Sequence, residues 1–451
     1  MNHRYPPQAR CSSYFAMLIV TLVGLSFSPS SLMGQEKDNA TTVKMIAAEG
    51  DGAKYWPGWR GPTRQGLVLS GQYPDKWSPE ENVLWKVEIP GNGNSSPVVW
   101  GDRIFVTSSI KDAEKRAVLC FRRSDGKQLW TAEVPEGTDE RAYWKNGFAS
   151  GTPATDGKHV YAYFGNRGVV CFDFEGKLVW HHELKPMNAL HGMACSPLLY
   201  KDLVIIFQEA RATRGAPRKK SYGFILALNK TTGKTVWKTP RKERVGWGSP
   251  IAVSVNGKDQ IIVNSSFSVY AYDPKDGTVV WNCKGMTVEV IPTPVVAHGL
   301  IYCCSGRRGP TLAIDPTGKG NVTQTHVKWS VKDDSPFVPS PLVYQGYLYT
   351  VNDILGEIRC FDAKTGDQMW LKRFPVDAAK HGFSASPIGV NGKVFFTSDK
   401  GNVYVFKAGP KYKLLHVNQL GEKTLATPAL VDGKWYVRTQ KHLYCFGVKK
   451  S

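Results

Sequence analysis

Two pairs of residues in this chain have types and spacing that could do chemistry. Cys303 and Cys304 are adjacent in "LIYCCSG" (300–306), and a disulfide between neighbours would be an unusual redox element. His191 and His381 begin two near copies, "HGMACSP" and "HGFSASP". Imidazole is the commonest metal ligand among side chains. Whether the cysteines could do redox chemistry or the histidines could bind a metal depends on the secondary structure in which each pair lies.

A repeated unit positions these residues. A small residue followed by Ser or Thr and then Pro occurs eight times, and a turn with an apolar run follows each copy. A third run ends in a turn and a tryptophan, as in "CFDFEGKLVW" (171–180). The runs are rich in β-branched and aromatic residues and are bounded by Gly, Asp and Asn, which is typical of short strands. Two copies of the third run are irregular: residues 313–329 are stretched, and residues 405–416 carry Leu415 where tryptophan is expected.

The repeats predict an all-β fold, an eight-bladed β-propeller of four-stranded antiparallel blades. One four-stranded sheet cannot bury both of its faces, whereas sheets stacked in a ring bury one another. The last unit stops at "LYCFGV" (443–448) without a fourth run, and "NVLWKVEIP" (82–90) supplies a spare run ahead of the first unit. We therefore expect strand 82–90 to join the blade at 426–448, closing the ring of residues 82–448 and hiding open sheet edges.

The register of the repeats assigns the cysteines a structural role. One equivalent position in different units is occupied by Cys120, Cys171, Cys360 and Cys445. Other units carry Ala or Val there, and equivalent positions in separate blades lie too far apart for a disulfide. Cys303 and Cys304 both fall inside the second strand of the fifth unit, where successive side chains point to opposite faces. We expect small buried hydrophobes rather than a disulfide framework.

Propellers usually bind ligands at the loops that lead into their innermost strands. The innermost strand should begin at each Ser/Thr–Pro, so the residues just before it should line a mouth. The candidate ligand-binding residues there are Asn146, Phe148, His191, Met193, Arg244, Trp247, Glu289, Phe337, His381 and Phe383. His191 and His381 belong to units three and seven, on opposite walls, and are not placed to share one ion at the roughly 2.0–2.1 Å of a Zn–N bond. We expect a structural role for both and no metal site; a polar and aromatic ring that holds a sugar or peptide is the functional alternative.

The repeat ending "D-x-x-T-G-K-x-x-W" resembles the repeat of the pyrroloquinoline quinone (PQQ)-like propeller family, and the resemblance covers residues 82–448. It implies the same propeller fold. It leaves the function open, because the family includes quinoprotein alcohol dehydrogenases, an outer-membrane-assembly lipoprotein that binds no cofactor, and sensor domains attached to bacterial kinases.

A quinoprotein function would need a cofactor site. The family's dehydrogenases hold Ca²⁺ with a Glu, an Asn and an Asp, add a catalytic Asp, stack the quinone on a Trp and carry an adjacent-cysteine disulfide beside it. At the expected mouth the resemblance offers only Glu289, with Asp333 and Asp334 nearby and Trp247 as a floor. The insertions that roof the dehydrogenase site are missing. We therefore expect no cofactor and no catalytic residue, with PQQ and calcium as the alternative.

The N-terminus predicts export. Arg4 and Arg10 precede the apolar run "YFAMLIVTLVGLSF" (14–27), which is short for a membrane span. We expect a signal peptide over residues 1–34, a polar linker and Trp-rich segment over 35–81, and a periplasmic or extracellular protein, with an uncleaved anchor as the alternative. "WPGWRGPTRQG" (56–66) resembles a segment that opens many exported bacterial members, and its tryptophans are expected to pack on the propeller.

Positive charge is concentrated in the third unit. The 451 residues carry a formal net charge of +20, and the runs 210–221 and 238–244 are strongly basic. We expect both on the surface as a patch for an anionic partner, with a solvated loop as the alternative. The predicted patch consists of Arg211, Arg214, Arg218, Lys219, Lys220, Arg241 and Lys242.

These patterns favour an exported, monomeric propeller that binds or scaffolds a protein or an anionic polysaccharide and does no chemistry of its own. One alternative is a PQQ- and calcium-dependent alcohol or sugar dehydrogenase. Another is a sensory or outer-membrane protein assembly module. Nucleic acid is not expected as a partner of an exported protein, and the basic surface is compatible with peripheral association with the envelope.

Overall fold

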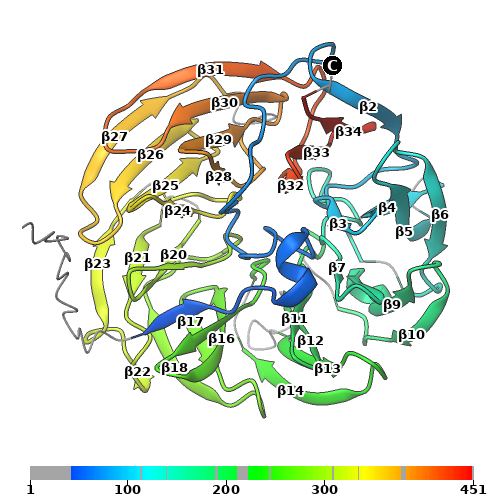
Figure 1. Ribbon diagram of the computed structural model, residues 1–451. Coiled ribbons are helices and arrows are strands. Elements are labelled where there is room, and N and C mark those ends of the chain that lie inside the picture. The colour runs from blue at the N-terminus through cyan, green and yellow to red at the C-terminus, as the bar shows by residue number, and fades with distance from the viewer. Residues whose placement is uncertain are drawn as a thin grey trace, which may run out of the picture. The chain divides into compact units, whose positions relative to one another are not determined.

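Eight β-sheets arranged in a ring make up the fold of the computed structural model (Figure 1). The structure describes residues 42–111, 114–138, 140–187, 191–210, 222–242, 245–306, 309–333, 335–376 and 382–448. Within these ranges seven sheets have four strands and one has six. The predicted eight-bladed all-β propeller is confirmed. None of the helices in the same ranges is long and apolar enough to span a membrane.

The first four blades follow one another along the chain. Blade 1 consists of β3 (Val98–Trp100), β4 (Arg103–Ile110), β5 (Lys115–Arg122) and β6 (Gln128–Glu133). Blade 2 consists of β7 (Ala154–Thr155), β8 (His159–Tyr163), β9 (Val169–Asp173) and β10 (Leu178–His182). Blade 3 consists of β11 (Leu198–Tyr200), β12 (Leu203–Ala210), β13 (Tyr222–Asn229) and β14 (Thr235–Arg241). Blade 4 consists of β15 (Ile251–Val255), β16 (Lys258–Ser265), β17 (Ser268–Tyr272) and β18 (Val279–Lys284), extended by β1 (Val43–Met45) and β22 (Gly320–Asn321).

The remaining blades complete the ring. Blade 5 consists of β19 (Val295–Ala297), β20 (Leu300–Cys304), β21 (Thr311–Ile314) and β23 (Val327–Val331). Blade 6 consists of β24 (Leu342–Tyr344), β25 (Tyr347–Asn352), β26 (Glu357–Asp362) and β27 (Gln368–Arg373). Blade 7 consists of β28 (Ile388–Val390), β29 (Lys393–Thr397), β30 (Asn402–Lys407) and β31 (Leu414–Gln419). Blade 8 consists of β32 (Ala429–Val431), β33 (Lys434–Arg438), β34 (His442–Phe446) and, from the other end of the chain, β2 (Val83–Glu88).

Strand β2 closes the ring as predicted. It pairs antiparallel with β34, with Trp85 opposite Cys445 and Glu88 opposite His442. The fourth strand of blade 8 therefore comes from the start of the propeller sequence and the other three come from its end. This closure pairs an edge that a linear array of sheets would leave open.

The Ser/Thr–Pro motif has a structural cause. The innermost strand of each blade follows this motif, and in seven of the eight blades the backbone N–H of the Ser or Thr donates to the hydroxyl of its counterpart in the next blade. Bonds of 2.9–3.1 Å join Ser96 to Thr152, Thr152 to Ser196, Ser196 to Ser249, Thr293 to Ser340, Ser340 to Ser386, Ser386 to Thr427 and Thr427 back to Ser96. A short hydroxyl side chain is therefore required at this position to link the inner strands around the channel.

The tryptophan that ends the repeat joins neighbouring blades. Trp180 Nε1 donates to Lys230 O at 2.9 Å, and Trp237 Nε1 donates to Pro274 O at 2.9 Å. The turn after Lys230 contains Gly233, whose φ is +69° and where a Cβ would lie 2.6 Å from the Trp180 ring. The tryptophan of one blade and the glycine turn of the next are thus two halves of one contact, which is why they recur together in the sequence.

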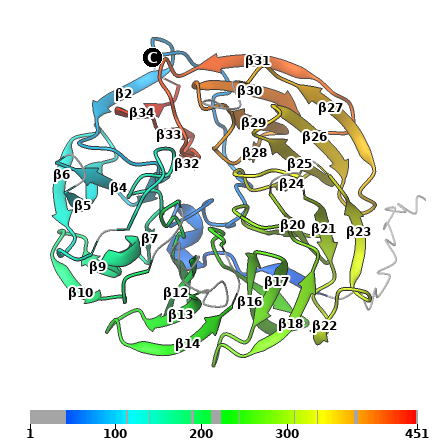
Figure 2. The ribbon, with the colours of Figure 1, turned by 180° about the vertical axis from the view of Figure 1, so that it is seen from behind.

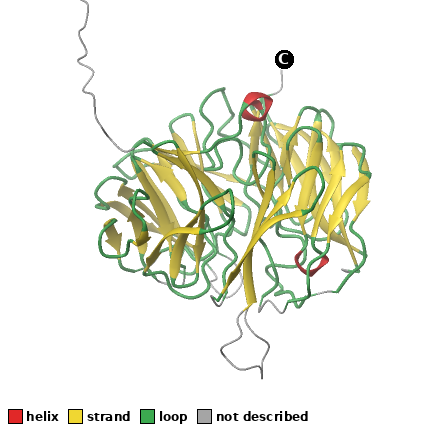
Figure 3. Ribbon diagram, turned by 90° about the horizontal axis from the view of Figure 1, so that it is seen from below, coloured by secondary structure: helices red, strands yellow, loops and turns green. Residues whose placement is uncertain are grey.

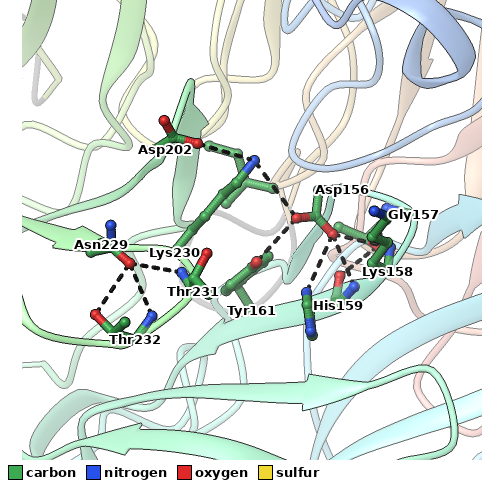
Figure 4. A network of polar contacts seen from close by, with 12 residues as sticks. Asp156, Gly157, Lys158, His159, Tyr161, Asp202, Asn229, Lys230, Thr231 and Thr232 are labelled. Atoms are coloured by element: carbon green, nitrogen blue, oxygen red, sulfur yellow. Dashed lines mark hydrogen bonds and ion pairs between the residues drawn. The ribbon is translucent and has the colours of Figure 1, made fainter.

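Charged turns reinforce the joint between blades 2 and 3 (Figure 4). Lys230 Nζ lies 3.9 Å from a carboxylate oxygen of Asp156 and 3.9 Å from one of Asp202. The hydroxyl of Tyr161 donates to Asp156 at 3.1 Å. Partly exposed ion pairs of this length contribute little each, so the buried Trp180 contact is the main stabilising element of the joint.

The cysteines of the described chain are free and buried. In the third strand of blade 2, Cys171 pairs with Tyr161 on one side and Trp180 on the other. Two large rings leave room for a small side chain only, so Cys or Ala is expected at this position. Cys303 and Cys304 lie within β20 in unbroken register with β21, which confirms their predicted mid-strand placement. Burial raises the pKa of Cys304 to about 12, which disfavours the reactive thiolate.

Blade 7 corrects one expectation about the repeats. The sequence alignment assigned the missing tryptophan position to Leu415, but Val405 pairs with His416, as Cys360 pairs with Trp370 in blade 6. The same β-bulge occurs in both blades, but Val405 and His416 are eleven positions apart whereas Cys360 and Trp370 are ten apart, so the connection in blade 7 is one residue longer. The imidazole of His416 contacts Asp75 O at 2.5 Å through Nε2, so the histidine makes a contact of the kind that the tryptophans make elsewhere.

Residues 56–68, which we call the crossing segment, run across one end of the central channel (Figures 1 and 2). Trp56 pairs with Val99 in blade 1 and is 1% exposed, and Arg60 is fully buried. Further contacts reach the inner strands of other blades, through Thr155 N to Pro57 O, Arg64 to Leu199 O, Val296 N to Gln65, Arg60 to Pro341 O and Val68 N to Gly389 O. The expectation that Trp56 packs on the propeller is confirmed, and the segment fills the channel at this end.

Figure 3 views the ring from the side, with its strands running between two faces. The two 3-10 helices, η1 (Gly50–Lys54) and η2 (Gly165–Arg167), lie at opposite faces. The crossing segment contacts mainly the middle or the C-terminal end of the inner strands, for example at Val99, Thr155 and Gly389. The residues that precede the Ser/Thr–Pro motifs lie at the opposite, N-terminal ends of these strands. That second face is the predicted mouth.

Candidate functional site

The mouth contains a cavity of about 450 Å³, which we call the central cavity. Its aromatic walls are formed by Trp59, Tyr143, Trp144, His191, Trp247 and Phe337. Between them lie hydroxyls of the inner Ser/Thr ring, including Ser196 and Ser340. Trp59 belongs to the crossing segment, and its Nε1 donates to Thr293 at 3.2 Å, so the segment that fills one end of the channel also supplies part of the cavity wall at the other. This volume and composition are typical of a small-ligand or peptide-side-chain site.

A second cavity of about 470 Å³, which we call the side cavity, lies between blades 8 and 1. Its polar walls include Asn92, Asp399, Lys423 and Arg438. The two cavities share five lining residues, Asn94, Trp144, Lys145, Asn146 and Leu425. They are therefore adjacent compartments of one mouth.

Residues 143–150, which we call the mouth loop, separate the two cavities. Asn94 Nδ2 donates to the backbone oxygens of Lys145 at 2.9 Å and Asn146 at 3.0 Å. Asn146 Nδ2 donates to His191 O at 2.9 Å. Lys145 Nζ reaches blade 7, where it lies 2.8 Å from Asp399 Oδ2. The loop that connects blades 1 and 2 is thus tied to blades 1, 3 and 7 across the mouth.

A row of aromatic rings follows the mouth from the loop to blade 4. Ring centroids lie 5.6 Å apart between Trp144 and Tyr143, 5.1 Å between Tyr143 and His191, and 5.8 Å between His191 and Trp247. Trp247 Nε1 donates to Gly192 O at 2.7 Å. At the outer end of the row, Trp144 is 64% exposed and Tyr143 is 44% exposed. Large aromatic side chains are rarely left in water without a partner, so this end is a candidate contact surface.

The carboxylates near the mouth hold loops in place. Asp353 Oδ1 accepts the backbone N–H groups of Phe337 at 3.1 Å and Val338 at 3.2 Å. Burial raises the pKa of Asp353 to about 6, against the opposing effect of the Lys145 charge. Asp399 accepts the N–H groups that precede the inner strand of blade 7, from Gly382 at 3.0 Å and Ser384 at 2.7 Å. Each acid therefore fixes the loop that leads into an inner strand.

The residues of this mouth do not fit a calcium–quinone site. Ca²⁺ requires six to eight oxygen ligands, so several carboxylates must converge. Over the part of the chain that the structure describes, no group of three or more His, Cys, Asp or Glu residues could hold a metal ion. Glu289 lines neither cavity, Asp333 is exposed, and Asp334 lies outside the described residues.

The structure brings some of the predicted mouth residues together and separates others. Asn146, His191, Trp247 and Phe337 line the central cavity, and Phe148 lines the side cavity. Met193 and Phe383 are buried instead, Met193 against the hydroxyl of Tyr163 and Phe383 against the ring of Tyr404. Glu289 is half-buried and lines neither cavity. Arg244 and His381 lie outside the described residues.

The predicted basic patch is corrected at one position. Arg241 is not on the surface: its side chain is 3% exposed and lies 3.0 Å from Glu209, and its NH2 donates to Ser265 at 2.7 Å. The guanidinium also stacks over the ring of Tyr270 at 4.4 Å. A single acid in the apolar strand "LVIIFQEA" signals a buried partner, and Glu209 could have been matched to Arg241 on that ground. Lys242 is exposed; Arg211, Arg214, Arg218, Lys219 and Lys220 lie outside the described residues.

Sequence reasoning missed several residues of the site. The mouth loop residues Tyr143, Trp144 and Lys145 were not predicted, although two adjacent aromatic residues in a polar connection, "RAYWKNGF" (141–148), are a signal for an exposed contact. Trp59 was expected to pack on the propeller and was not placed in a cavity wall. Arg438 follows the apolar run Trp435–Val437 at the end of β33, where a charged residue signals a buried partner or ligand.

Comparison with protein families gives one match over most of the chain. A family model described as "Outer membrane protein assembly factor BamB" matches residues 117–372 and 355–446. These ranges cover blades 2 to 8 and part of blade 1.

Known proteins that resemble the chain have different activities. Outer membrane protein assembly factor BamB of Yersinia pestis is 22% identical over 349 residues, 66% of this chain and 82% of that protein. Methanol dehydrogenase [cytochrome c] subunit 1 of Methylorubrum extorquens is 30% identical over 146 residues, 30% of this chain and 23% of that protein. The solved quinohemoprotein alcohol dehydrogenase from Comamonas testosteroni superimposes with a TM-score of 0.60 at 14% identity, over 89% of this chain and 82% of that one, which supports the fold alone.

Proposed function

The chain belongs to the family described as outer membrane protein assembly factor BamB, and from this premise we propose that it is an exported, non-catalytic propeller that binds a polypeptide segment at its mouth. The Yersinia pestis protein that the chain matches over 82% of its length is named for assembly of outer membrane proteins. A protein partner is the ligand class that agrees with that relative. Export follows from the predicted signal over residues 1–34, and it argues against a nucleic-acid partner.

The observation that carries the proposal is the aromatic row at the mouth. It begins with the exposed rings of Trp144 and Tyr143 and leads into the central cavity at His191 and Trp247. Tryptophan and tyrosine are enriched among the few residues that dominate the binding energy of protein interfaces, because they bury large areas at small entropic cost.

An anionic polysaccharide is the weaker partner class. Its support is the basic run 210–221, of which residues 211–221 lie outside the described residues, and the net charge of +20. Charge raises association rates with any anion and does not by itself define a ligand. The aromatic mouth therefore favours polypeptide over glycan.

A quinoprotein dehydrogenase is the second candidate function. It is favoured by the 30% identity with a methanol dehydrogenase subunit over 146 residues and by a central cavity of about 450 Å³ with Trp59 and Trp247 in its wall. The carboxylates at the mouth are engaged by backbone N–H groups, as described for Asp353 and Asp399, so the residues do not supply the calcium site. We derive no reaction step for this candidate.

Binding at the mouth can be tested by filling the central cavity. Ala194 lines this cavity, whereas Ala53 is exposed in η1. We expect fluorescent, aromatic-rich unfolded peptides to bind the full-length mature protein, and Ala194→Trp to abolish binding while Ala53→Trp leaves it unchanged. Thermal unfolding of both variants controls for folding. If the two variants bound the peptides with equal affinity, the mouth would not be the peptide-binding site.

The rival function has its own assay. Titration with PQQ in the presence and absence of Ca²⁺, followed by tryptophan fluorescence and dye-coupled alcohol oxidation, should give no calcium-dependent binding and no turnover. Tight calcium-dependent binding with alcohol oxidation would replace the binding propeller by the dehydrogenase.

A further inference from the structure

Arg438 is a buried cation in the wall of the side cavity. It ends β33 and is 1% exposed. Its NH1 donates to Ser95 Oγ at 2.8 Å and to Thr107 O at 2.7 Å, which anchors the guanidinium to blade 1. The Nε has no hydrogen-bond acceptor, and burial lowers the pKa of Arg438 to about 9. Among the described residues no carboxylate forms an ion pair with Arg438, whose hydrogen bonds there go to a hydroxyl and a backbone carbonyl.

Other buried arginines of the chain show what is unusual here. Arg241 has Glu209 as a partner at 3.0 Å, which is the ordinary solution for a buried guanidinium. Arg60 donates to two backbone carbonyls and lies in the crossing segment, away from both cavities. Arg438 differs from both because it borders a cavity large enough to admit a ligand. An uncompensated buried charge is costly, and an anion in the side cavity would offset that cost.

The other charges of the side cavity define the anion. Lys423 is an exposed cation at its rim, while Lys145 is already paired with Asp399 at 2.8 Å. The Asp399 carboxylate also lines the side cavity and repels any bound anion. This repulsion is stronger for a dianion than for a monoanion. Because NH1 of Arg438 is engaged by Ser95 and Thr107 and its Nε is buried, NH2 is the guanidinium nitrogen left to donate to one oxygen of a carboxylate. The cavity therefore suits a monoanionic carboxylate better than a phosphate dianion.

The adjacent central cavity indicates which kind of molecule would bear this carboxylate. Asn94, Trp144, Lys145, Asn146 and Leu425 line both compartments, so a ligand that places an aromatic or apolar group among the rings of the central cavity has its adjoining atoms beside the side cavity. The last residue of a polypeptide has this combination of a side chain next to a carboxylate, and capture of chain termini is a recurring mode of peptide recognition.

We propose that the side cavity binds the C-terminal carboxylate of a polypeptide at Arg438 and Lys423, with the terminal side chains in the central cavity. This inference rests on the proposed peptide-binding function and adds the end of the chain that is recognised. It also explains why Arg438 stays charged and unpaired at the joint between the closing blade and blade 1, where Thr427 and Ser96 complete the inner ring.

The test compares acids with amides on the unaltered protein. N-acetylphenylalanine and its amide are titrated into the full-length mature chain by calorimetry, together with aromatic-ending peptides of about ten residues in both forms. We expect the acids to bind at least tenfold more tightly than the amides. Equal binding of acids and amides would overturn the carboxylate site, and because this comparison needs no mutation it does not depend on the folding of any variant.

Variants locate the effect. We expect Arg438→Gln to remove the preference for acids and the exposed Lys423→Gln to reduce it two- to threefold, while Lys441→Gln, an exposed change that lines neither cavity, leaves it intact. A preference that survives in both Arg438→Gln and Lys423→Gln would overturn the assignment to the side cavity.

The outcomes separate this inference from the proposed function. If long peptides bound equally well as acids and as amides, the peptide-binding function would be supported and the proposed site for the terminal carboxylate would be wrong. No binding of any peptide or of N-acetylphenylalanine would overturn both. Arg438-dependent binding of an oligouronate in place of peptides would assign the carboxylate to an acidic glycan and overturn the polypeptide terminus.

Discussion

The two ends of the central channel are built in opposite ways. At one end the crossing segment hydrogen-bonds to inner strands of six blades and buries Trp56 and Arg60. At the other end the mouth loop is tied down by Asn94 and Lys145 and leaves Trp144 64% exposed. The first end has the packing of a protein core and the second has the amphipathic surface of a binding site.

This difference shows how an eight-bladed ring manages its central gap. Eight sheets in a ring leave a channel too wide for their own side chains to fill, and the chain fills one end with its own backbone and a tryptophan. The other end keeps two cavities of about 450 and 470 Å³. The crossing segment, which closes one end, also supplies Trp59 to the wall of the central cavity. The packing of this segment therefore helps to shape the cavity at the open end.

The largest effect should come from the plugged end. Trp56→Ala removes a ring that is 1% exposed and packs against Gly61, where a Cβ would lie 2.6 Å from it. We expect a loss of about 3–5 kcal/mol in the free energy of unfolding, because a large buried side chain is deleted and leaves a cavity. Urea unfolding followed by far-ultraviolet circular dichroism measures it. A loss below about 1 kcal/mol would mean that the crossing segment rests on the ring without stabilising it.

The same contrast explains what the sequence could predict. The ring was predictable because each repeat carries both halves of its joints, a Ser/Thr hydroxyl for the inner ring and a tryptophan with a glycine turn for the outer contact. The contacts repeat between neighbours, so most copies of the unit carry the same signal; blade 7, with His416 in the tryptophan position, is an exception. The tryptophan position of blade 7 was assigned to Leu415 instead of His416 because the connection between its third and fourth strands is one residue longer than in blade 6, and no periodic signal marks such an insertion.

The two ends of the channel were less predictable because each occurs only once. Arg60 meets Pro341 across 281 residues, and Lys145 meets Asp399 from the far side of the mouth. No periodicity reports such contacts. Residues that stand before the Ser/Thr–Pro motif, such as Asn146 and Trp247, could be placed at the mouth from the repeat alone, whereas a long connection such as 135–150 gives no sign of which blades it will reach.

An intermediate effect, with a defined pH dependence, should come from the mouth. Asp353 has a folded pKa of about 6 and an unfolded pKa of about 3.9. The folded protein therefore binds more protons between these values, and the contribution of Asp353 to stability falls as pH rises from about 4 to about 6. Asp353→Asn keeps an oxygen for the N–H groups of Phe337 and Val338 and carries no charge. We expect it to exceed the unaltered protein by on the order of 2 kcal/mol at pH 8 and to match it near pH 4.

The control for this prediction is Asp333→Asn, a change at an exposed carboxylate that should leave the pH profile of unfolding unaltered. Lys145→Met should enlarge the stability difference that Asp353→Asn produces, because the Lys145 charge favours the ionised form of Asp353. If Asp353→Asn were less stable than the unaltered protein at pH 8, the burial argument would be wrong and the ionised carboxylate would be a stabilising loop anchor.

The smallest effect on stability should come from the exposed end of the aromatic row. Trp144→Ala removes a ring that is 64% exposed, so we expect the free energy of unfolding to change by less than about 0.5 kcal/mol. Affinity for aromatic-ending peptides should nevertheless fall about tenfold or more, as at an interface hot spot. Leu69→Ala, which is 80% exposed in the N-terminal region outside both cavities, should change neither quantity. If Trp144→Ala were destabilised as much as Trp56→Ala, or if it bound peptides with unchanged affinity, the assignment of one channel end to stability and the other to binding would be wrong.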